Sequence, residues 1–285
     1  MIADKRSHAQ FLRPNVAPRR PPRTRTTRQK NGVRPLLEAV KLMGMGDSRR
    51  HRGPHPEDAQ LFSSDALPRL KPAVDDLSWL RTRGYAEPSA IKLVGDRHQL
   101  RRRQRVAVGR CACAETKRAS RAGRALRTGE LAGRTLFVDG LNVITTIEVA
   151  LARGVLLLGR DQCLRDMASF HGSYRLVHET ERAVQILVAV VDSLQPSEAV
   201  VYIDRPVSNS GRLAEIVRKA AAAVHSRLRA ETADGVDETL KRSHGVAATA
   251  DSAILDECDR WLNLARIAVE QHRREIEPMW LLDLS

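Results

Sequence analysis

The carboxyl-terminal half of the sequence alternates between short apolar runs and longer amphipathic segments. Short apolar runs cover 135–139, 199–204 and 246–249, and each is typical of a strand buried in a parallel sheet. Between them, 179–194 and 210–224 repeat apolar residues at the spacing of one helix face. Repeated strand–helix units predict an α/β fold with a parallel sheet covered by helices on both faces.

Weaker patterns complete this prediction. Further strands are expected at 154–159 and 227–231, and 279–284 is expected to close the sheet. Helices are expected at 142–153 and 261–272, with one or two helical turns within 161–170.

Upstream, 55–116 reads as a small all-α domain. Its first helix repeats leucine and valine at helical spacing from Leu67 to Leu80 and ends at Gly84, where a left-handed cap is favoured. A second helix opens at Glu87, before a proline, and a third runs from about 100 to 113. The polar stretch 117–133 is expected to be a linker, and 134–285 the α/β domain.

Residues 1–54 form a basic tail that we expect to be disordered, because repeated proline and high charge leave too little apolar surface to bury. The tail is open to three interpretations: a nucleic-acid-binding segment, an organelle transit peptide, or an overextended reading frame that truly starts at Met43 or Met45. A secretory signal is not expected, because no apolar run follows the basic residues. We assign this tail no function.

Charge is distributed unevenly along the chain. The net charge of +14 divides into +10 for 1–50, +8 for 51–130 and −4 for 131–285. A basic amino-terminal half suggests a polyanionic partner, although an arginine-rich codon usage gives the same bias. The four cysteines lack the spacing of a zinc site, and no apolar run approaches the roughly 20 residues that span a bilayer. The sequence therefore predicts a soluble cytoplasmic protein with reduced thiols and no membrane partner.

Three of the predicted strands end at or near a carboxylate. These are Asp139, Asp204 and Asp251, and Asn142 opens the helix after the first. In a parallel sheet such ends converge, and carboxylates brought together repel unless a cation offsets them. Oxygen ligands without nearby Cys or His favour Mg²⁺ or Mn²⁺. Such an ion supports attack of water on a phosphodiester. The alternative for each acid alone is a helix cap.

Two other stretches carry candidate nucleic-acid-binding residues. In the turn after Asp204, serine and asparagine side chains precede a helix whose free N–H groups suit an anion, and Arg205 is placed to pair with the acid or with a phosphate. An ordinary strand–turn–helix junction explains the same residues. The helix at 100–113 carries an arginine cluster that suits a phosphate backbone or, equally, a solvated helix face. The candidates are Arg101, Arg102, Arg103, Arg105, Arg205, Ser208, Asn209 and Ser210.

Short motifs in the chain resemble those of known families. Val138-Asp-Gly-Leu-Asn-Val143, Asp204-Arg-Pro-Val-Ser-Asn-Ser-Gly211 and Thr249-Ala-Asp-Ser-Ala-Ile-Leu-Asp256 resemble the strand-end motifs of PIN-like nucleases, nearest the NYN branch. Arg83-Gly-Tyr85 and Leu93-Val-Gly-Asp-Arg97 resemble the prokaryotic family called domain of unknown function 434. The resemblance implies a PIN-like three-layer α/β/α sandwich with a central, mainly parallel sheet, preceded by the small helical domain. It further implies Mg²⁺ or Mn²⁺ held by Asp139 and Asp251, with Asn142 as polar partner, and an RNA or single-stranded substrate.

The sequence also departs from the PIN pattern. Ala253 stands where a further acid is usual, and Asp256 lies about 140° around the helix from Asp251, so we rank it lower. The usual mid-domain acid has no clear counterpart, and Asp161 and Asp166 are the candidates.

Three functions follow from these patterns. The first is a metal-dependent ribonuclease or related phosphodiesterase that uses Asp139, Asp204 and Asp251 as metal ligands. The second is a catalytically inactive nucleic-acid-binding or regulatory protein with the same surface. The third, a phosphatase of the haloacid-dehalogenase type, is disfavoured because Leu141 stands where a second aspartate is needed. The sequence does not indicate an oligomeric state.

Overall fold

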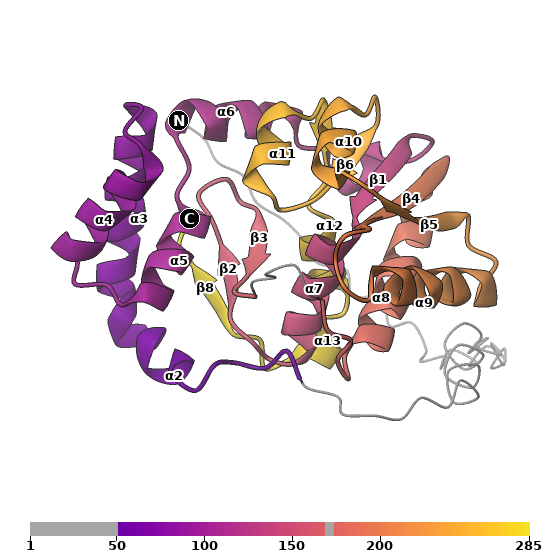
Figure 1. Ribbon diagram of the computed structural model, residues 1–285, viewed down its shortest axis with the longest axis horizontal. Coiled ribbons are helices and arrows are strands. Elements are labelled where there is room, and N and C mark those ends of the chain that lie inside the picture. The colour runs from indigo at the N-terminus through magenta and orange to yellow at the C-terminus, as the bar shows by residue number, and fades with distance from the viewer. Residues whose placement is uncertain (1–50, 169–173) are drawn as a thin grey trace, which may run out of the picture.

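The computed structural model describes residues 51–168 and 174–285, so the expectations for the basic tail lie almost entirely outside the described residues. Helices form the amino-terminal part: α2 (Asp58–Leu61), α3 (Leu67–Thr82), α4 (Glu87–Arg97), α5 (Arg102–Cys111) and α6 (Glu115–Arg124). Short 3₁₀ turns occupy Ser64–Ala66 and Thr128–Glu130. Helices α2 to α5 gather at one end of the molecule, and α6 runs from them towards the main sheet (Figure 1).

Strands and helices then alternate to the end of the chain, as the hydrophobic pattern predicts. The strands are β1 (Thr135–Asp139), β2 (Leu156–Leu158), β3 (Leu164–Asp166), β4 (Glu198–Asp204), β5 (Leu228–Ala233), β6 (Val246–Ala248), β7 (Arg260–Trp261) and β8 (Leu281–Asp283). The helices are α7 (Gly140–Leu151), α8 (Thr180–Ser193), α9 (Ser210–Ala223), α10 (Val236–Arg242), α11 (Ser252–Glu257), α12 (Leu264–Gln271) and α13 (Arg273–Ile276).

The main sheet has five parallel strands in the order β5-β4-β1-β6-β7, and helices cover both of its faces. Leu136 and Val138 of β1 point to one face, where α7, α8, α9 and α12 pack. Phe137 points to the other, against α10 and α11. This alternation is what a strand imposes on successive side chains. The α/β class, the parallel sheet and the preceding helices are therefore confirmed.

Gly140 fixes how closely α7 approaches the sheet. A Cβ at this position would lie 2.7 Å from Val201 Cγ1 and 2.9 Å from the carbonyl oxygen of Tyr202. Only glycine therefore allows the helix to start directly against β4. This glycine therefore serves the packing of α7 against the sheet.

Two expectations for the weaker patterns are wrong, and two other segments have different bounds from those expected. The segment 279–284 does not close the main sheet, because β8 pairs with β2 in a separate three-stranded sheet of order β3-β2-β8. Strand β3 replaces the helical turns expected near Asp161, because its residues pair antiparallel with β2. Helix α12 starts at Leu264, since Trp261 belongs to edge strand β7. The expected 117–133 linker contains most of α6.

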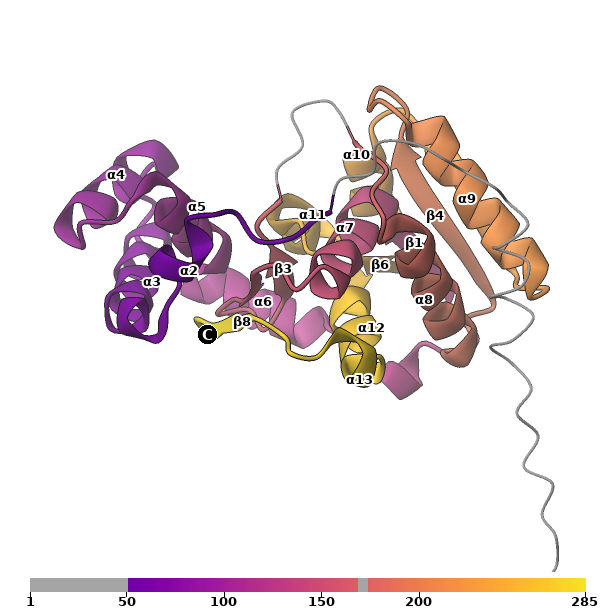
Figure 2. The same ribbon diagram turned by 90° about the horizontal axis from the view of Figure 1, so that it is seen from below.

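The second sheet joins the amino-terminal helices to the rest of the molecule. Leu157 and Leu282, from neighbouring strands, share one hydrophobic core with α2 to α5. Figure 2 shows β3 and β8 between these helices and the main sheet. The helical region is therefore packed onto the α/β part through a common core. The described residues contain no helix with the length and apolarity needed to cross a bilayer.

Candidate active site

A cavity of about 460 Å³ lies at the carboxyl edge of the main sheet. Asp139 at the end of β1, Asp204 at the end of β4 and Asp251 just after β6 all line it, together with Asn142 in the first turn of α7. Neighbouring strands run parallel here, so their ends bring the side chains to the same edge. The four residues expected to be catalytic thus meet in one cavity.

Asp139 is the most deeply placed of these acids. It caps α7, with Oδ1 accepting from the backbone N–H of Asn142 at 3.2 Å and Oδ2 accepting from Thr249 Oγ1 at 2.9 Å. Burial raises the pKa of this carboxyl to about 7 against these two hydrogen bonds, and the charges of Asp237 and Asp204 add to the rise. The surroundings of Asp139 therefore disfavour its charged form unless a cation binds nearby.

Hydrogen bonds tie the ends of β1 and β6 together. Asn142 Oδ1 accepts from the backbone N–H of Ala250 at 2.8 Å, so its side chain holds the loop after β6. Thr249 Oγ1, which donates to Asp139, also accepts from the backbone N–H of Asp251 at 3.0 Å. Asp251 then caps α11 through Oδ1. Asp139 and Asp251 therefore both cap helices, which is the alternative role that the sequence offers for each acid. Each carboxylate keeps one or more lone pairs for a ligand in the cavity.

A fourth carboxylate, Asp237, joins the cavity from the first turn of α10. Burial raises its pKa, and the charges of Asp251 and Asp204 raise it further. Burial likewise raises the pKa of Asp204, opposed by a hydrogen bond from the backbone N–H of Val236. Sequence patterns missed Asp237 because they did not predict α10 at all.

The cavity lining also includes positive charge and a fifth acid. Arg110 of α5 and Arg165 of β3 line it beside Asp166 and Thr145. Asp166 accepts from Thr146 Oγ1 at 2.8 Å and from the backbone N–H of Ala168 at 2.7 Å. The guanidinium of Arg110 donates to the carbonyl oxygens of Asp166 and Ala168. Asp166, one of two candidates for a mid-domain acid, is therefore in the cavity.

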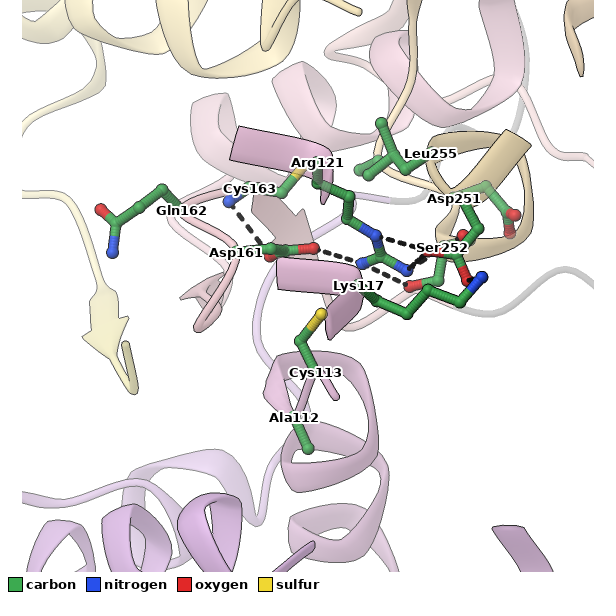
Figure 3. Close-up of polar contacts among 12 residues, drawn as sticks. Ala112, Cys113, Lys117, Arg121, Asp161, Gln162, Cys163, Asp251, Ser252 and Leu255 are labelled. Atoms are coloured by element: carbon green, nitrogen blue, oxygen red, sulfur yellow. Dashed lines mark hydrogen bonds and ion pairs between the residues drawn. The ribbon is translucent and has the colours of Figure 1, made fainter. Parts of the chain in front are cut away.

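Asp161, the other candidate, is not among the residues that line the cavity. Arg165 and Arg121 both bind it, with Arg121 Nη1 at 2.5 Å from Asp161 Oδ2. Burial alone would raise the pKa of Asp161, but the two guanidinium groups lower it to about 2. Figure 3 shows Arg121 between Asp161 and Ser252. Asp256 binds the same arginine, which agrees with its lower rank as a site residue.

A metal ion would have to fit the spacing of these acids. Within residues 51–168 and 174–285, no three Asp, Glu, His or Cys side chains stand close enough to enclose an ion by themselves. Mg²⁺ usually keeps several waters and binds one or two carboxylates directly. Among the residues that the structure describes, the cavity offers carboxylate oxygens and no Cys or His, and the pKa values of Asp139, Asp204 and Asp237 are all raised, which fits a hydrated cation of this kind.

The arginine cluster of the third helix divides into two pairs. Arg103 binds the buried carboxylate of Asp58, and Arg105 binds Asp96 and two backbone carbonyls, so both hold the helical region together. Arg101 and Arg102 are exposed to solvent. Of the four arginines of this helix that are expected to contact nucleic acid, Arg103 and Arg105 are therefore already paired within the protein.

The turn after β4 contains ordinary junction contacts. Arg205 binds Asp234 at 2.8 Å and the carbonyl oxygen of Thr232, rather than its neighbour Asp204. Asn209 stands at the start of α9 in a left-handed conformation, and its side chain donates to the carbonyl oxygen of Tyr174 instead of accepting from the helix. Ser210 donates to the carbonyl oxygen of Arg205, and Ser208 is exposed. None of these side chains lines the cavity.

The fold and cavity define an α/β protein with a parallel sheet, an acidic site at its carboxyl edge and an amino-terminal helical region. Residues 69–124 match the family described as Protein of unknown function (DUF434), and residues 128–267 match Domain of unknown function (DUF5616). The chain is 25% identical to Uncharacterized protein MJ0935 of Methanocaldococcus jannaschii over 186 residues, covering 65% of this chain and 88% of that protein. No solved structure matches the chain significantly. The resemblance to family 434 is confirmed.

Proposed function

We propose that the protein is a metal-dependent nuclease that hydrolyses phosphodiesters in RNA or single-stranded nucleic acid with a PIN-like, NYN-type carboxyl-terminal domain. One observation carries the proposal. Asp139, Asp204, Asp237 and Asp251 come from four different parts of the chain and line one cavity, and the charges of neighbouring acids add to the raised pKa values of Asp139 and Asp237. Such an arrangement of like charges is costly without a function that uses it.

The residues of the cavity suit phosphodiester hydrolysis. A Mg²⁺ or Mn²⁺ ion would polarise a phosphoryl oxygen and ease deprotonation of the attacking water. Asp139, Asp204 and Asp251 supply oxygen ligands, while Thr249 and Asn142 fix the positions of Asp139 and the loop after β6. The pKa of Asp139, raised to about 7 in the absence of metal, gives the site a carboxyl whose ionised form a bound cation would stabilise.

The basic helical region supports a nucleic-acid substrate. Arg110 brings positive charge from α5 into the cavity, and Arg101 and Arg102 present further charge at the exposed start of the same helix. A strand with its reactive phosphate in the cavity would find cations along this helix, which strengthens binding in a salt-dependent manner. The four buried cysteines form no disulfide, which supports a place in the reducing cytoplasm.

A catalytically inactive nucleic-acid-binding protein is the second candidate. It is favoured by the absence, among the described residues, of three side chains placed to enclose a metal ion. In this case the carboxylates would line the cavity without forming a catalytic metal site, and the arginines would bind the nucleic acid.

Incubation of the purified protein with labelled single-stranded RNA and Mn²⁺ or Mg²⁺ tests the proposal. We expect cleavage that EDTA abolishes and that falls at least about 100-fold in Asp139→Asn, a loss typical of removing a key catalytic group. Asp259→Asn, an exposed acid outside the cavity, is the matched control and should retain full activity. RNA binding without cleavage would support the inactive candidate, and turnover of a small phosphomonoester alone would contradict both.

A further inference from the structure

Thr145 carries an unpaired hydroxyl in the wall of the acidic cavity. The side chain is 1% exposed and lines the cavity one helical turn beyond Leu141. Its Oγ1 has no hydrogen-bond partner within residues 51–168 and 174–285, where it is the one buried side-chain oxygen or nitrogen so placed. The hydroxyl of the next residue, Thr146, shares its one donor between Asp166 Oδ2 at 2.8 Å and the carbonyl oxygen of Asn142 at 3.0 Å.

An unpaired buried hydroxyl destabilises a protein, because it gives up its hydrogen bonds to water and receives none in return. Valine has nearly the same shape and would fill the position without that loss. Other buried threonines of the structure are satisfied: Thr146 and Thr180 bind carboxylates, and Thr249 binds Asp139. The hydroxyl at Thr145 therefore has no partner among the described residues, and its oxygen has almost no exposed surface. Because the residue lines the cavity, a turn about its Cα–Cβ bond would bring the hydroxyl to a ligand there.

The charges around Thr145 indicate the chemistry of that ligand. Arg110 and Arg165 line the same cavity, whereas Asp139, Asp204 and Asp251 line it from the strand ends. Guanidinium groups and a hydroxyl donor favour an anion with oxygen acceptors. Five carboxylates line the same cavity, including Asp166 beside Arg110, and they would repel such an anion unless a bound cation offsets them.

We propose that Thr145 and Arg110 form a phosphate-binding subsite in which Thr145 Oγ1 donates to a non-bridging oxygen of the substrate phosphodiester. This proposal rests on the proposed nuclease function and deepens it. Arg110 contributes charge while its guanidinium stays bonded to the carbonyl oxygens of Asp166 and Ala168. Thr145 acts as a positioning residue for the phosphate, beside Arg110 and a cation held by the carboxylates.

The first test compares the thermal unfolding of the full chain with that of Thr145→Val and Thr145→Ser, in EDTA. Thr145→Val should raise the melting temperature by about 2 to 4 °C, because it removes an unpaired polar group. Thr239→Val is the matched control: its hydroxyl donates to the carbonyl oxygen of Gly235, so this change should leave the melting temperature equal or lower. A lower melting temperature for Thr145→Val would show that the hydroxyl has a structural partner and would overturn the proposal.

The second test measures binding of a fluorescein-labelled oligouridylate RNA by anisotropy, with Ca²⁺ in place of Mg²⁺ to prevent cleavage. Thr145→Val should weaken binding about 10-fold, the loss expected for one hydrogen bond to a charged group. Thr145→Ser keeps the hydroxyl and should bind within about 2-fold of the parent chain, a difference that removing one methyl group allows. Unchanged RNA binding in Thr145→Val, even with a raised melting temperature, would overturn the subsite while leaving nuclease activity possible.

Failure of the proposed nuclease function can be distinguished from failure of the phosphate-binding subsite. If the parent chain binds no RNA, millimolar inorganic phosphate takes its place as the probe in the melting experiment. A melting temperature that phosphate raises in the parent chain and in Thr145→Ser, but not in Thr145→Val, would keep the subsite and remove the nuclease. No response to phosphate in any of the three would overturn the subsite as well.

Discussion

At the scale of single residues, Asp139 is the position where burial and ionisation oppose each other most strongly. Burial raises the pKa of its carboxyl from 3.8 to about 7, so the ionised form is disfavoured in the folded protein. A group with a raised pKa gives its full stability below the unfolded pKa and loses it as the pH rises through the folded pKa. In the absence of metal, we therefore expect Asp139→Asn to have a higher free energy of unfolding than the parent chain, by an amount that grows between about pH 4 and pH 7.

Urea unfolding in EDTA at a series of pH values measures this difference. The gain of Asp139→Asn over the parent chain should grow towards roughly 4 kcal/mol, which corresponds to about three pKa units. Added Mg²⁺ should reduce the gain, because a cation stabilises the ionised carboxylate. Asp259→Asn, exposed and outside the cavity, should follow the parent curve. Parallel curves for Asp139→Asn and the parent chain would show that the carboxyl titrates normally.

The sequence pattern predicts the site residues that lie at strand ends but does not predict those that lie elsewhere. Asp139, Asp204 and Asp251 were predictable because parallel strands must deliver their ends to one edge. Asp237 was not, because α10 is seven residues long and carries only Val236 and Leu240 as an apolar signal. Roles of the remaining site residues in binding or catalysis stay predictions until activity is measured.

At the scale of elements, α6 holds the loop beside the cavity through a buried arginine. Arg121 is 4% exposed, and its guanidinium binds Asp161, Asp256 and the carbonyl oxygen of Ser252. Arg121→Ala would leave the buried Asp161 with one partner fewer and Asp256 without this arginine. We expect it to lower the free energy of unfolding by about 3 to 5 kcal/mol, the usual result of breaking a buried ion pair from one side.

Chemical denaturation followed by far-UV circular dichroism checks this prediction, with a matched variant on the same helix. Arg118 lies one turn earlier and binds only Glu115 on the surface in the described structure. Arg118→Ala should therefore change the free energy of unfolding by less than about 0.5 kcal/mol. Equal effects of the two changes would mean that the Arg121 network adds no stability.

The same network explains why sequence patterns misread α6. A linker was expected for 117–133 because that stretch is polar and rich in arginine and glycine. The one side chain that α6 buries is Arg121, so no apolar face marks the helix. Its partners Asp161 and Asp256 are about 40 and 135 positions away in the chain, a separation that local pattern does not register.

At the scale of the whole molecule, the common core of the helical region and the second sheet was the feature least accessible to sequence. The α/β class and the positions of most strands along the chain follow from local periodicity, which decides each element separately. The pairing of β8 with β2 depends on which of two sheets a short apolar strand joins, and the apolar pattern of the strand does not specify that choice. Only the packed structure distinguishes them.

This common core predicts that the molecule unfolds as one unit. Leu157 of β2 is fully buried against the amino-terminal helices, so Leu157→Ala should lower the free energy of unfolding by about 2 to 5 kcal/mol. Because the core is shared, hydrogen exchange should accelerate in both α3 and α8, at opposite ends of the molecule. Leu93→Ala, at a side chain 59% exposed on α4, should change the free energy of unfolding by less than about 0.5 kcal/mol. It should leave hydrogen exchange in both helices unchanged. Faster exchange in α3 with unchanged exchange in α8 would show two independently stable parts, and the position of Arg110 in the cavity would then depend on a contact able to open by itself.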